Sequence, residues 1–233
     1  MTDTKFERLA LLAGEEGLEK LANTSVLVFG AGGVGSFAAE ALVRSGIGKI
    51  GIIDHDTICA SNINRQIEAT TLTLGLPKAS ALRKRLLEIN PDCEIKAQDE
   101  LFCLESKNNF GIDNTDYVID AIDSINHKLD LIETVCKAGK KLYSSMGMAL
   151  KMDPSRIKTA SVWKTDKCPL ARLVRQGLRK RGFTGDFTVI YSDEMLPCTV
   201  SREKKVNGSI VTVTGSAGLL LASLVLRDII GLQ

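Results

Sequence analysis

The residues best suited to bind phosphate lie between positions 30 and 78. Gly30-Ala-Gly32-Gly33-Val-Gly35 has the spacing G-x-G-x-x-G, in which glycines permit a tight turn and bring the backbone close to a phosphate. Asp54 follows Gly35 by 19 residues, a spacing typical of a carboxylate that accepts ribose hydroxyls. These features predict a nucleotide site, for which a dinucleotide-dependent oxidoreductase is the first interpretation.

A group of polar side chains further along favours a nucleoside triphosphate instead. Arg65 can donate a bidentate pair of hydrogen bonds to phosphate oxygens, and Lys78 can place a compact charge near the β- and γ-phosphates. Hydride transfer needs no such groups, so the pattern favours ATP. The full set of predicted nucleotide-binding residues in this stretch is Asp54, Asp56, Asn62, Asn64, Arg65, Gln66 and Lys78.

Two further aspartates follow an apolar segment in Val118-Ile-Asp120-Ala-Ile-Asp123. An open α/β sheet binds its ligands at the carboxyl ends of its strands, where these aspartates are expected to lie. A carboxylate beside triphosphate oxygens suggests Mg²⁺, and Asp123 is the predicted metal ligand. Asp120 is assigned to the nucleotide site, and capping of the following helix is its alternative role.

Apolar segments alternate with amphipathic ones along most of the chain. The expected strands are 25–29, 49–53, 94–97, 117–120, 141–145, 156–163, 187–191 and 209–213, and the expected helices are 15–21, 34–44, 78–89, one ending near 137, 169–181 and 217–230. The alternation predicts an α/β fold, a Rossmann-like doubly wound and mostly parallel sheet. Residues 1–150 are expected to form the nucleotide-binding core, and residues 151–233 a C-terminal α+β extension of the same domain.

Composition excludes several classes of protein. The chain has 233 residues, of which 44% are hydrophobic and 25% charged, with a net charge of +2; this excludes a disordered, collagen-like or disulfide-scaffold protein. The six cysteines form no C-x-x-C pair, which argues against a zinc site built from closely spaced thiolates. The first residues show no apolar signal segment and the apolar run 219–226 is too short to span a membrane, so a cytoplasmic location without membrane contact is expected.

One segment is much more basic than the rest of the chain. Residues 164–181 hold seven basic residues and one acidic residue. On a helix, Arg172, Arg175 and Arg179 share one face, and Lys180 and Arg181 follow directly. Such a face suits RNA phosphates, and a solvated helix surface is the alternative. The five residues are therefore predicted contacts to an RNA substrate.

The motifs together resemble those of a known superfamily. The glycine loop, D-x-D, S-N-x-N-R-Q, G-x-x-K and D-x-x-D between residues 26 and 123 resemble the ubiquitin-activating-enzyme-like ATP-dependent adenylyltransferases. Within that superfamily the chain is most similar to the tRNA threonylcarbamoyladenosine dehydratases. That similarity extends to Phe6-x-Arg8, Gly14-Glu-x-Gly17, Ser144-Ser-Met-Gly147, Asp153-Pro154 and Cys168-Pro-Leu-Ala171.

The resemblance implies an activity and roles for particular residues. A carboxylate on the threonine part of the modified adenosine, beside the tRNA anticodon, would be adenylated by ATP, and ring closure would then release AMP. Asp54 would hold the ribose, Asn64, Arg65 and Lys78 the triphosphate, and Asp123 the Mg²⁺. Arg8 would reach the triphosphate of a partner subunit, which implies a homodimer; catalysis is thus assigned to Arg8, Arg65, Lys78 and Asp123. A sulfur-transfer protein is a further expected partner.

Three alternatives stay open, and one of them is the dinucleotide-dependent oxidoreductase already named. An adenylyltransferase of the same superfamily could activate the C-terminal glycine of a sulfur-carrier or ubiquitin-like protein; the missing C-x-x-C pairs count against it. Cys168 and Cys198 are the candidate thiols for that chemistry, with ordinary buried thiols as the simpler interpretation. A module that binds a nucleotide without turnover is the non-enzymatic alternative. Met148-Ala-Leu150 is bulkier than the small, glycine-rich stretch that the family often has there.

Overall fold

Seven strands form one sheet in a computed structural model that describes residues 5–195 and 207–232. The strand order is β3-β2-β1-β4-β5-β7-β6, and every neighbouring pair is parallel except β6 and β7. The strands are β1 Ser25–Phe29, β2 Lys49–Ile53, β3 Glu94–Gln98, β4 Tyr117–Asp120, β5 Lys141–Ser145, β6 Ile157–Ser161 and β7 Thr188–Ser192. The predicted α/β fold with a mostly parallel sheet is confirmed. The division of the chain at residue 150 stays a prediction.

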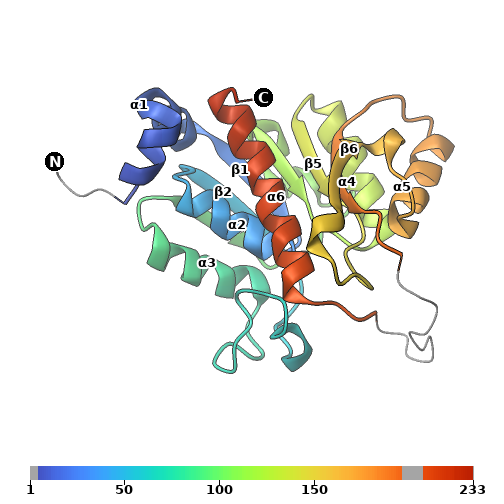
Figure 1. The fold of residues 1–233 in the computed structure, drawn as a ribbon, viewed down its shortest axis with the longest axis horizontal. Helices are drawn as coiled ribbons and strands as arrows, with labels where there is room; N and C mark the ends of the chain where they lie inside the picture. Colours follow the sequence, from blue (N-terminus) through green and yellow to red (C-terminus); the bar gives the residue numbers. More distant parts are fainter. Residues whose placement is uncertain (1–4, 196–206, 233) are drawn as a thin grey trace.

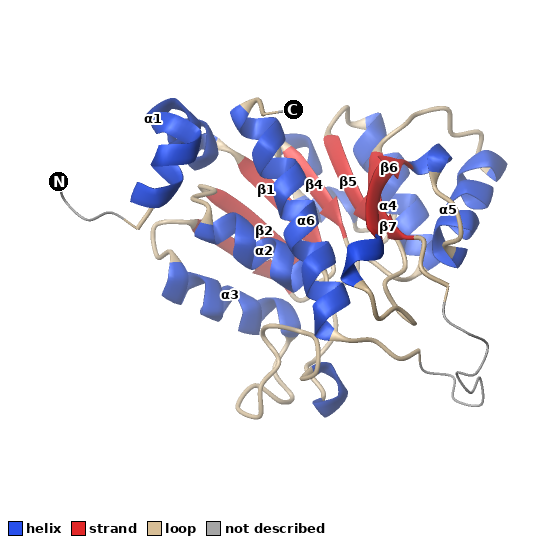
Figure 2. Cartoon of the chain, in the orientation of Figure 1, coloured by secondary structure: helices blue, strands red, loops and turns tan. Residues whose placement is uncertain are grey.

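Helices cover both faces of the sheet (Figures 1 and 2). One face carries α1, α2, α3 and α6, and the other carries α4 and α5. The helices are α1 Glu7–Asn23, α2 Gly35–Arg44, α3 Lys78–Ile89, α4 Ile125–Lys137, α5 Pro169–Lys180 and α6 Val211–Ile230. Short 3₁₀ helices span Ala60–Asn62, Lys107–Phe110, Ile112–Asn114, Pro154–Arg156 and Val162–Lys164.

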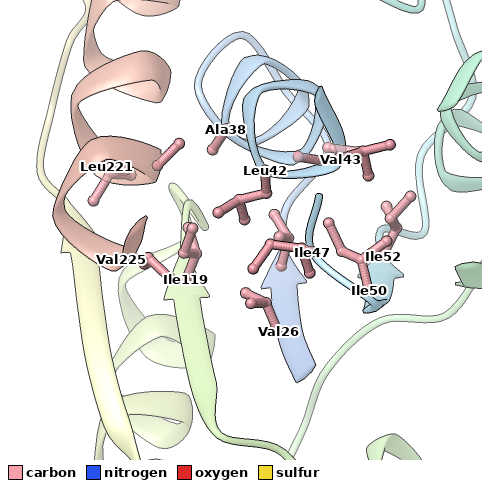
Figure 3. Packing of buried hydrophobic residues seen from close by; sticks show 14 of the residues in the cluster. Val26, Ala38, Leu42, Val43, Ile47, Ile50, Ile52, Ile119, Leu221 and Val225 are labelled. Atoms are coloured by element: carbon pink, nitrogen blue, oxygen red, sulfur yellow. The ribbon is translucent and has the colours of Figure 1, made fainter. Parts of the chain in front are cut away.

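The core on the first face lies between the central strands and helices α2 and α6 (Figure 3). Leu42 of α2 and Leu221 of α6 are fully buried beside Val26 of β1 and Ile119 of β4. Because helices cover both faces, the central strands bury nearly every residue, which explains their continuous apolar sequence. Each fully buried aliphatic side chain of this kind contributes about 1.5–3 kcal/mol to folding.

The strand expected over residues 209–213 is wrong, because α6 begins at Val211. The β-branched residues favour a strand locally, but Val213 and Ala217 are spaced for a helix and lie buried among residues of α2. Gly218 allows close contact, since a Cβ atom there would stand 2.3 Å from the Val34 carbonyl oxygen. Helix α6 has 20 residues and, by length and composition only, is long and apolar enough to cross a membrane. In this structure its apolar residues pack against α2, α1 and β5.

Helix α1 is longer than the expected 15–21 and begins at Glu7. It is interrupted at Gly14, whose backbone has φ 70° and ψ 170°, a conformation that glycine adopts without strain. Phe6, immediately before the helix, packs against Gly46 beyond the C-terminal end of α2. The start of α1 therefore lies at the end of α2 opposite the glycine loop.

Candidate active site

A cavity of about 720 Å³ lies at the carboxyl ends of the central strands, the position at which open α/β sheets bind ligands. Ten of the predicted residues line it: Gly30, Gly32, Gly33, Asp54, Asp56, Asn62, Arg65, Gln66, Lys78 and Asp123. A more open hollow of about 710 Å³, next to Thr115 and Tyr117 at the start of β4, contains none of them. The larger set of convergent polar groups makes the first cavity the candidate active site.

The glycine loop joins β1 to α2 and forms one wall of the cavity. Gly30 has φ +92°, and a Cβ atom there would lie 2.7 Å from the Ala121 carbonyl oxygen. A Cβ atom at Gly35 would lie 1.8 Å from the Gly30 carbonyl oxygen, so Gly35 serves the turn and does not line the cavity. The loop thus places the N-terminal end of α2, with its partial positive charge, beside the space where a phosphate could bind.

Asp54 stabilises the glycine loop through hydrogen bonds. One carboxylate oxygen accepts a hydrogen bond from the Ala31 N–H at 2.6 Å, and the other accepts from the Asp56 N–H at 2.8 Å. Each carboxylate oxygen has a second lone pair, so a ribose hydroxyl can still donate to Asp54 from the cavity. Asp54 thus lies at the cavity wall, and its contact to a ribose stays a prediction.

Lys78 begins α3 and points its buried ammonium group at Asp56. The Lys78 Nζ atom lies 2.7 Å from Asp56 Oδ2, and the side chains are 8% and 52% exposed, respectively. Burial tends to raise the pKa of Asp56, but the hydrogen bond and charge of Lys78, together with His55, outweigh burial and lower that pKa. The pair holds a cation at the cavity wall, with its hydrogen-bond donors available to an incoming anion.

Arg65 is half-buried and held by its own loop. Its Nη1 atom donates to the Ser61 carbonyl at 2.7 Å and to Asn64 Oδ1 at 3.0 Å. Asn64 in turn donates to the Ser209 carbonyl at 2.8 Å and does not line the cavity. In this structure Asn64 orients the guanidinium and joins the loop to the segment before α6; its contact to the triphosphate stays a prediction.

Asp120 also lies outside the cavity, contrary to its assignment to the nucleotide site. Its carboxylate is fully buried, 2.8 Å from Lys128 Nζ, and accepts hydrogen bonds from the Ser144 hydroxyl at 2.7 Å and the Ile122 N–H at 3.1 Å. Lys128 donates to the Ile122 carbonyl at 2.7 Å. Asp120 does not reach the cavity because it is buried at the end of β4. There its ion pair with Lys128 fixes the segment that carries Asp123. Asp120 does not cap a helix either, because Ser124 is the N-cap residue of α4.

Asp123 exposes its carboxylate to the cavity and makes no hydrogen bond or ion pair with residues 5–195 or 207–232. A free carboxylate fits the preference of Mg²⁺ for oxygen ligands. Asp54, His55 and Asp56 also offer ligand atoms within 4.8 Å of one another. The Asp54 carboxylate already accepts two backbone hydrogen bonds and the Asp56 carboxylate pairs with Lys78, so Asp123 is the better fit to a metal.

Several residues that line the cavity were not predicted. Thr214 of α6 approaches the loop closely, since its Oγ1 atom would lie 3.0 Å from a Cβ atom at Gly33. Others follow β3 and β5, lie at the starts of α4 and α5, or precede α6. They include Glu100, Phe102, His127, Met146, Gly147, Met148, Ala149, Leu170, Asn207 and Ser209. No spacing pattern links these residues to the glycine loop. Only the topology brings them there.

Arg8 and the basic side chains of α5 do not line the cavity. Arg8 is exposed near the start of α1. Directly after α5, Arg181 pairs with Asp130 at 2.6 Å and Glu133 at 2.8 Å, which ties its guanidinium to α4; its contact to RNA stays a prediction. Arg175 donates to Thr165, and Arg179 lies 5.5 Å above the Trp163 ring. Arg172, Arg179 and Lys180 stay exposed. Cys168 is buried, and Cys198 lies outside the described residues.

Comparison with known proteins places this geometry in a family. A model of the ThiF family matches residues 6–233. The chain belongs to the ThiF family. It is 45% identical over 190 residues to the tRNA threonylcarbamoyladenosine dehydratase of Bacillus subtilis, a match that covers 82% of this chain and 75% of that protein.

Solved structures of a ThiF-family relative share the whole fold. The Escherichia coli tRNA N6-threonylcarbamoyladenosine dehydratase in complex with AMP has a TM-score of 0.90 and 34% identity, and the match covers 97% of this chain and 94% of that one. The same enzyme in complex with ATP has a TM-score of 0.89 and 33% identity, with the same coverage. The predicted resemblance is confirmed.

Proposed function

We propose that this protein catalyses the ATP-dependent dehydration of N6-threonylcarbamoyladenosine in tRNA, through adenylation of the substrate carboxylate. The observation that carries the proposal is the cavity itself, in which the glycine loop, Arg65 and Lys78 face Asp123. This arrangement provides cations for phosphates and a carboxylate for Mg²⁺. The ThiF-family relatives with this name, and the relative structures bound to ATP and AMP, support the same activity.

The proposed reaction has two steps. A carboxylate oxygen of the threonine moiety attacks the α-phosphorus of ATP, the bond to pyrophosphate breaks, and an acyl-adenylate forms. The neighbouring ureido group then attacks the activated carbonyl and expels AMP, which closes a five-membered ring with net loss of water. Because the second step is intramolecular, a high effective concentration replaces a protein nucleophile. This explains how the chemistry can proceed with Cys168 buried.

The cavity supplies charge and position for the first step. The guanidinium of Arg65 and the ammonium of Lys78 would stabilise negative charge that develops on the phosphates. Asp123 would hold Mg²⁺, which supplies further neutralisation of the leaving pyrophosphate when it is bound. Asp54 would orient the nucleotide through a ribose hydroxyl.

A homodimer is part of the proposal because Arg8 lies near the end of α2 that is opposite its own subunit's glycine loop. Helix α1 starts beside Gly46, at the opposite end of α2 from the glycine loop, and the ten residues of α2 span about 15 Å. Leu11 and Leu12 on α1 are 83% and 81% exposed, an apolar surface that a second copy would cover. Arg8 of that copy would then reach the triphosphate.

The tRNA would lie along α5. Leu170, at the start of this helix, lines the cavity, and the exposed residues Arg172, Arg179 and Lys180 extend from there over about 15 Å of helix. The backbone phosphates of the anticodon arm would contact this side while the modified base enters the cavity. A sulfur-transfer protein as a further partner, and a cytoplasmic location, rest on the sequence resemblance and are proposed on that ground.

Isotope exchange between pyrophosphate and ATP tests the proposal. Exchange should require tRNA that carries threonylcarbamoyladenosine, and mass spectrometry of the tRNA nucleosides should show a product lighter by one water. Exchange that requires a protein with a Gly-Gly tail would instead identify a protein-activating enzyme. Binding of ATP without exchange on either substrate would identify a nucleotide-binding module, and binding of NAD in preference to ATP an oxidoreductase.

A further inference from the structure

Trp163 is the single tryptophan of the chain and lies between β6 and α5, on the 3₁₀ helix Val162–Lys164. Its indole Nε1 donates a hydrogen bond to the Gly185 carbonyl at 2.9 Å, and its backbone N–H donates to the Ser161 hydroxyl at 3.2 Å. The ring packs against the core on the α4–α5 face of the sheet but stays partly exposed. A ring that is already fixed in this way loses little freedom when a flat ligand stacks beside it.

The guanidinium of Arg179 lies over this ring. Its Cζ atom is 5.5 Å from the centroid of the Trp163 ring, a cation–π contact, and Arg179 is exposed. Among the residues that the structure describes, no carboxylate pairs with Arg179. Arg181, in contrast, is held by Asp130 and Glu133. A guanidinium is planar and can hold an aromatic ring on one side while a nucleobase stacks on the other.

The face of α5 that carries Arg179 runs from this ring toward the nucleotide cavity. Arg172, Arg175 and Arg179 share that face, and Arg175 donates to Thr165, which holds the face against the loop before the helix. Leu170 lines the cavity and lies about 14 Å from Arg179 along the helix. Binding of phosphates needs only cations. A guanidinium backed by an indole ring suits an unpaired base as well.

We propose that Trp163 and Arg179 form a stacking platform for an unpaired nucleobase of the tRNA anticodon loop, a few nucleotides from the modified adenosine in the cavity. The inference rests on the proposed function, because that function places the tRNA along α5. A base stacked on such a platform strengthens binding by roughly 5–150-fold. A paired stem offers no free base to stack, so the platform selects the loop and holds it at the distance from which the modified adenosine enters the cavity.

The fluorescence of Trp163 reports on this position alone, because the chain has no other tryptophan. The probes are an unmodified RNA hairpin with the sequence of a tRNA anticodon arm and a fully paired RNA duplex of the same length. Each is titrated into the full chain. The hairpin should quench the fluorescence of Trp163, and the duplex should leave it nearly unchanged, because only the hairpin presents unpaired bases.

Two matched variants separate stacking from phosphate contact, with RNA affinity measured by fluorescence anisotropy of dye-labelled RNA. Lysine keeps the charge of arginine but has no flat surface. Arg179→Lys should therefore weaken hairpin binding about fivefold and change neither duplex affinity nor the slope of hairpin affinity against salt. Arg172→Lys makes the same exchange on the same helix face. Because lysine can also contact a phosphate, Arg172→Lys should change hairpin affinity less than twofold.

Three results would overturn the inference. The first is fluorescence of Trp163 that stays unchanged at saturating hairpin, or a wild-type protein that does not bind the hairpin. The second is Arg179→Lys protein that binds the hairpin as tightly as wild type. The third is an equal loss of hairpin and duplex affinity in Arg179→Lys, which would identify Arg179 as a phosphate contact. The proposed function fails separately, if tRNA that carries threonylcarbamoyladenosine supports neither pyrophosphate exchange nor loss of water, so the two failures are distinguishable.

Discussion

Replacing Lys128 with methionine removes the cation from the buried pair beneath the cavity. Both Lys128 and Asp120 are fully buried, and the Lys128 Nζ atom lies 2.8 Å from Asp120 Oδ2. Methionine is similar in length but leaves the Asp120 charge without its cation and the Ile122 carbonyl without its donor. Breaking one side of such a pair costs about 3–5 kcal/mol, a large fraction of the roughly 5–15 kcal/mol by which proteins are typically stable.

The assay is urea unfolding followed by far-ultraviolet circular dichroism and by the fluorescence of Trp163, the single tryptophan. Lys128→Met alone should lower the free energy of unfolding by about 3–5 kcal/mol. The double variant Asp120→Asn with Lys128→Met removes both charges and should recover about half of that loss, because no uncompensated charge stays buried. A loss below about 1 kcal/mol in the single variant, or strictly additive losses, would refute this account of the pair.

Three further outcomes test the site. Arg65→Ala should lower kcat/KM in pyrophosphate exchange by roughly 10²–10³-fold, equivalent to about 3–4 kcal/mol, and near-wild-type exchange would contradict its role. Mixing inactive Arg8→Ala subunits with inactive Asp123→Ala subunits should restore about a quarter of the sites if Arg8 acts across a dimer, and no recovery would place Arg8 elsewhere. Arg172→Ala should weaken tRNA binding and reduce the slope of affinity against salt by about one phosphate contact. Arg181→Ala should leave that slope unchanged, because its guanidinium is held by two carboxylates.

The strands and the glycine loop could be predicted because their causes are local. The sequences of strands β1 and β4 are continuous apolar runs because helices cover both of their faces. The G-x-G-x-x-G spacing corresponds to contacts within one strand–turn–helix unit, where a Cβ atom at Gly35 would clash with Gly30. Such local rules carry over from sequence to structure directly.

The errors have long-range causes. Lys128 reads as a solvated lysine near the start of a helix, so the sequence gives no sign that it neutralises Asp120. The segment 209–213 reads as a strand from its β-branched residues, yet tertiary packing on α2 makes its second half helical. The Asn64 contact to Ser209 joins residues 145 positions apart, which no spacing rule can anticipate.

The meeting of α2 with α6 has a consequence for synthesis of the chain. Gly33 and Thr214 touch across the cavity rim, and Gly218 seats α6 on α2. A nascent chain that has only its first half outside the ribosome therefore exposes the apolar side of α2 and holds an unfinished phosphate loop. Nucleotide affinity should emerge only after α6 has been synthesised and has packed against α2.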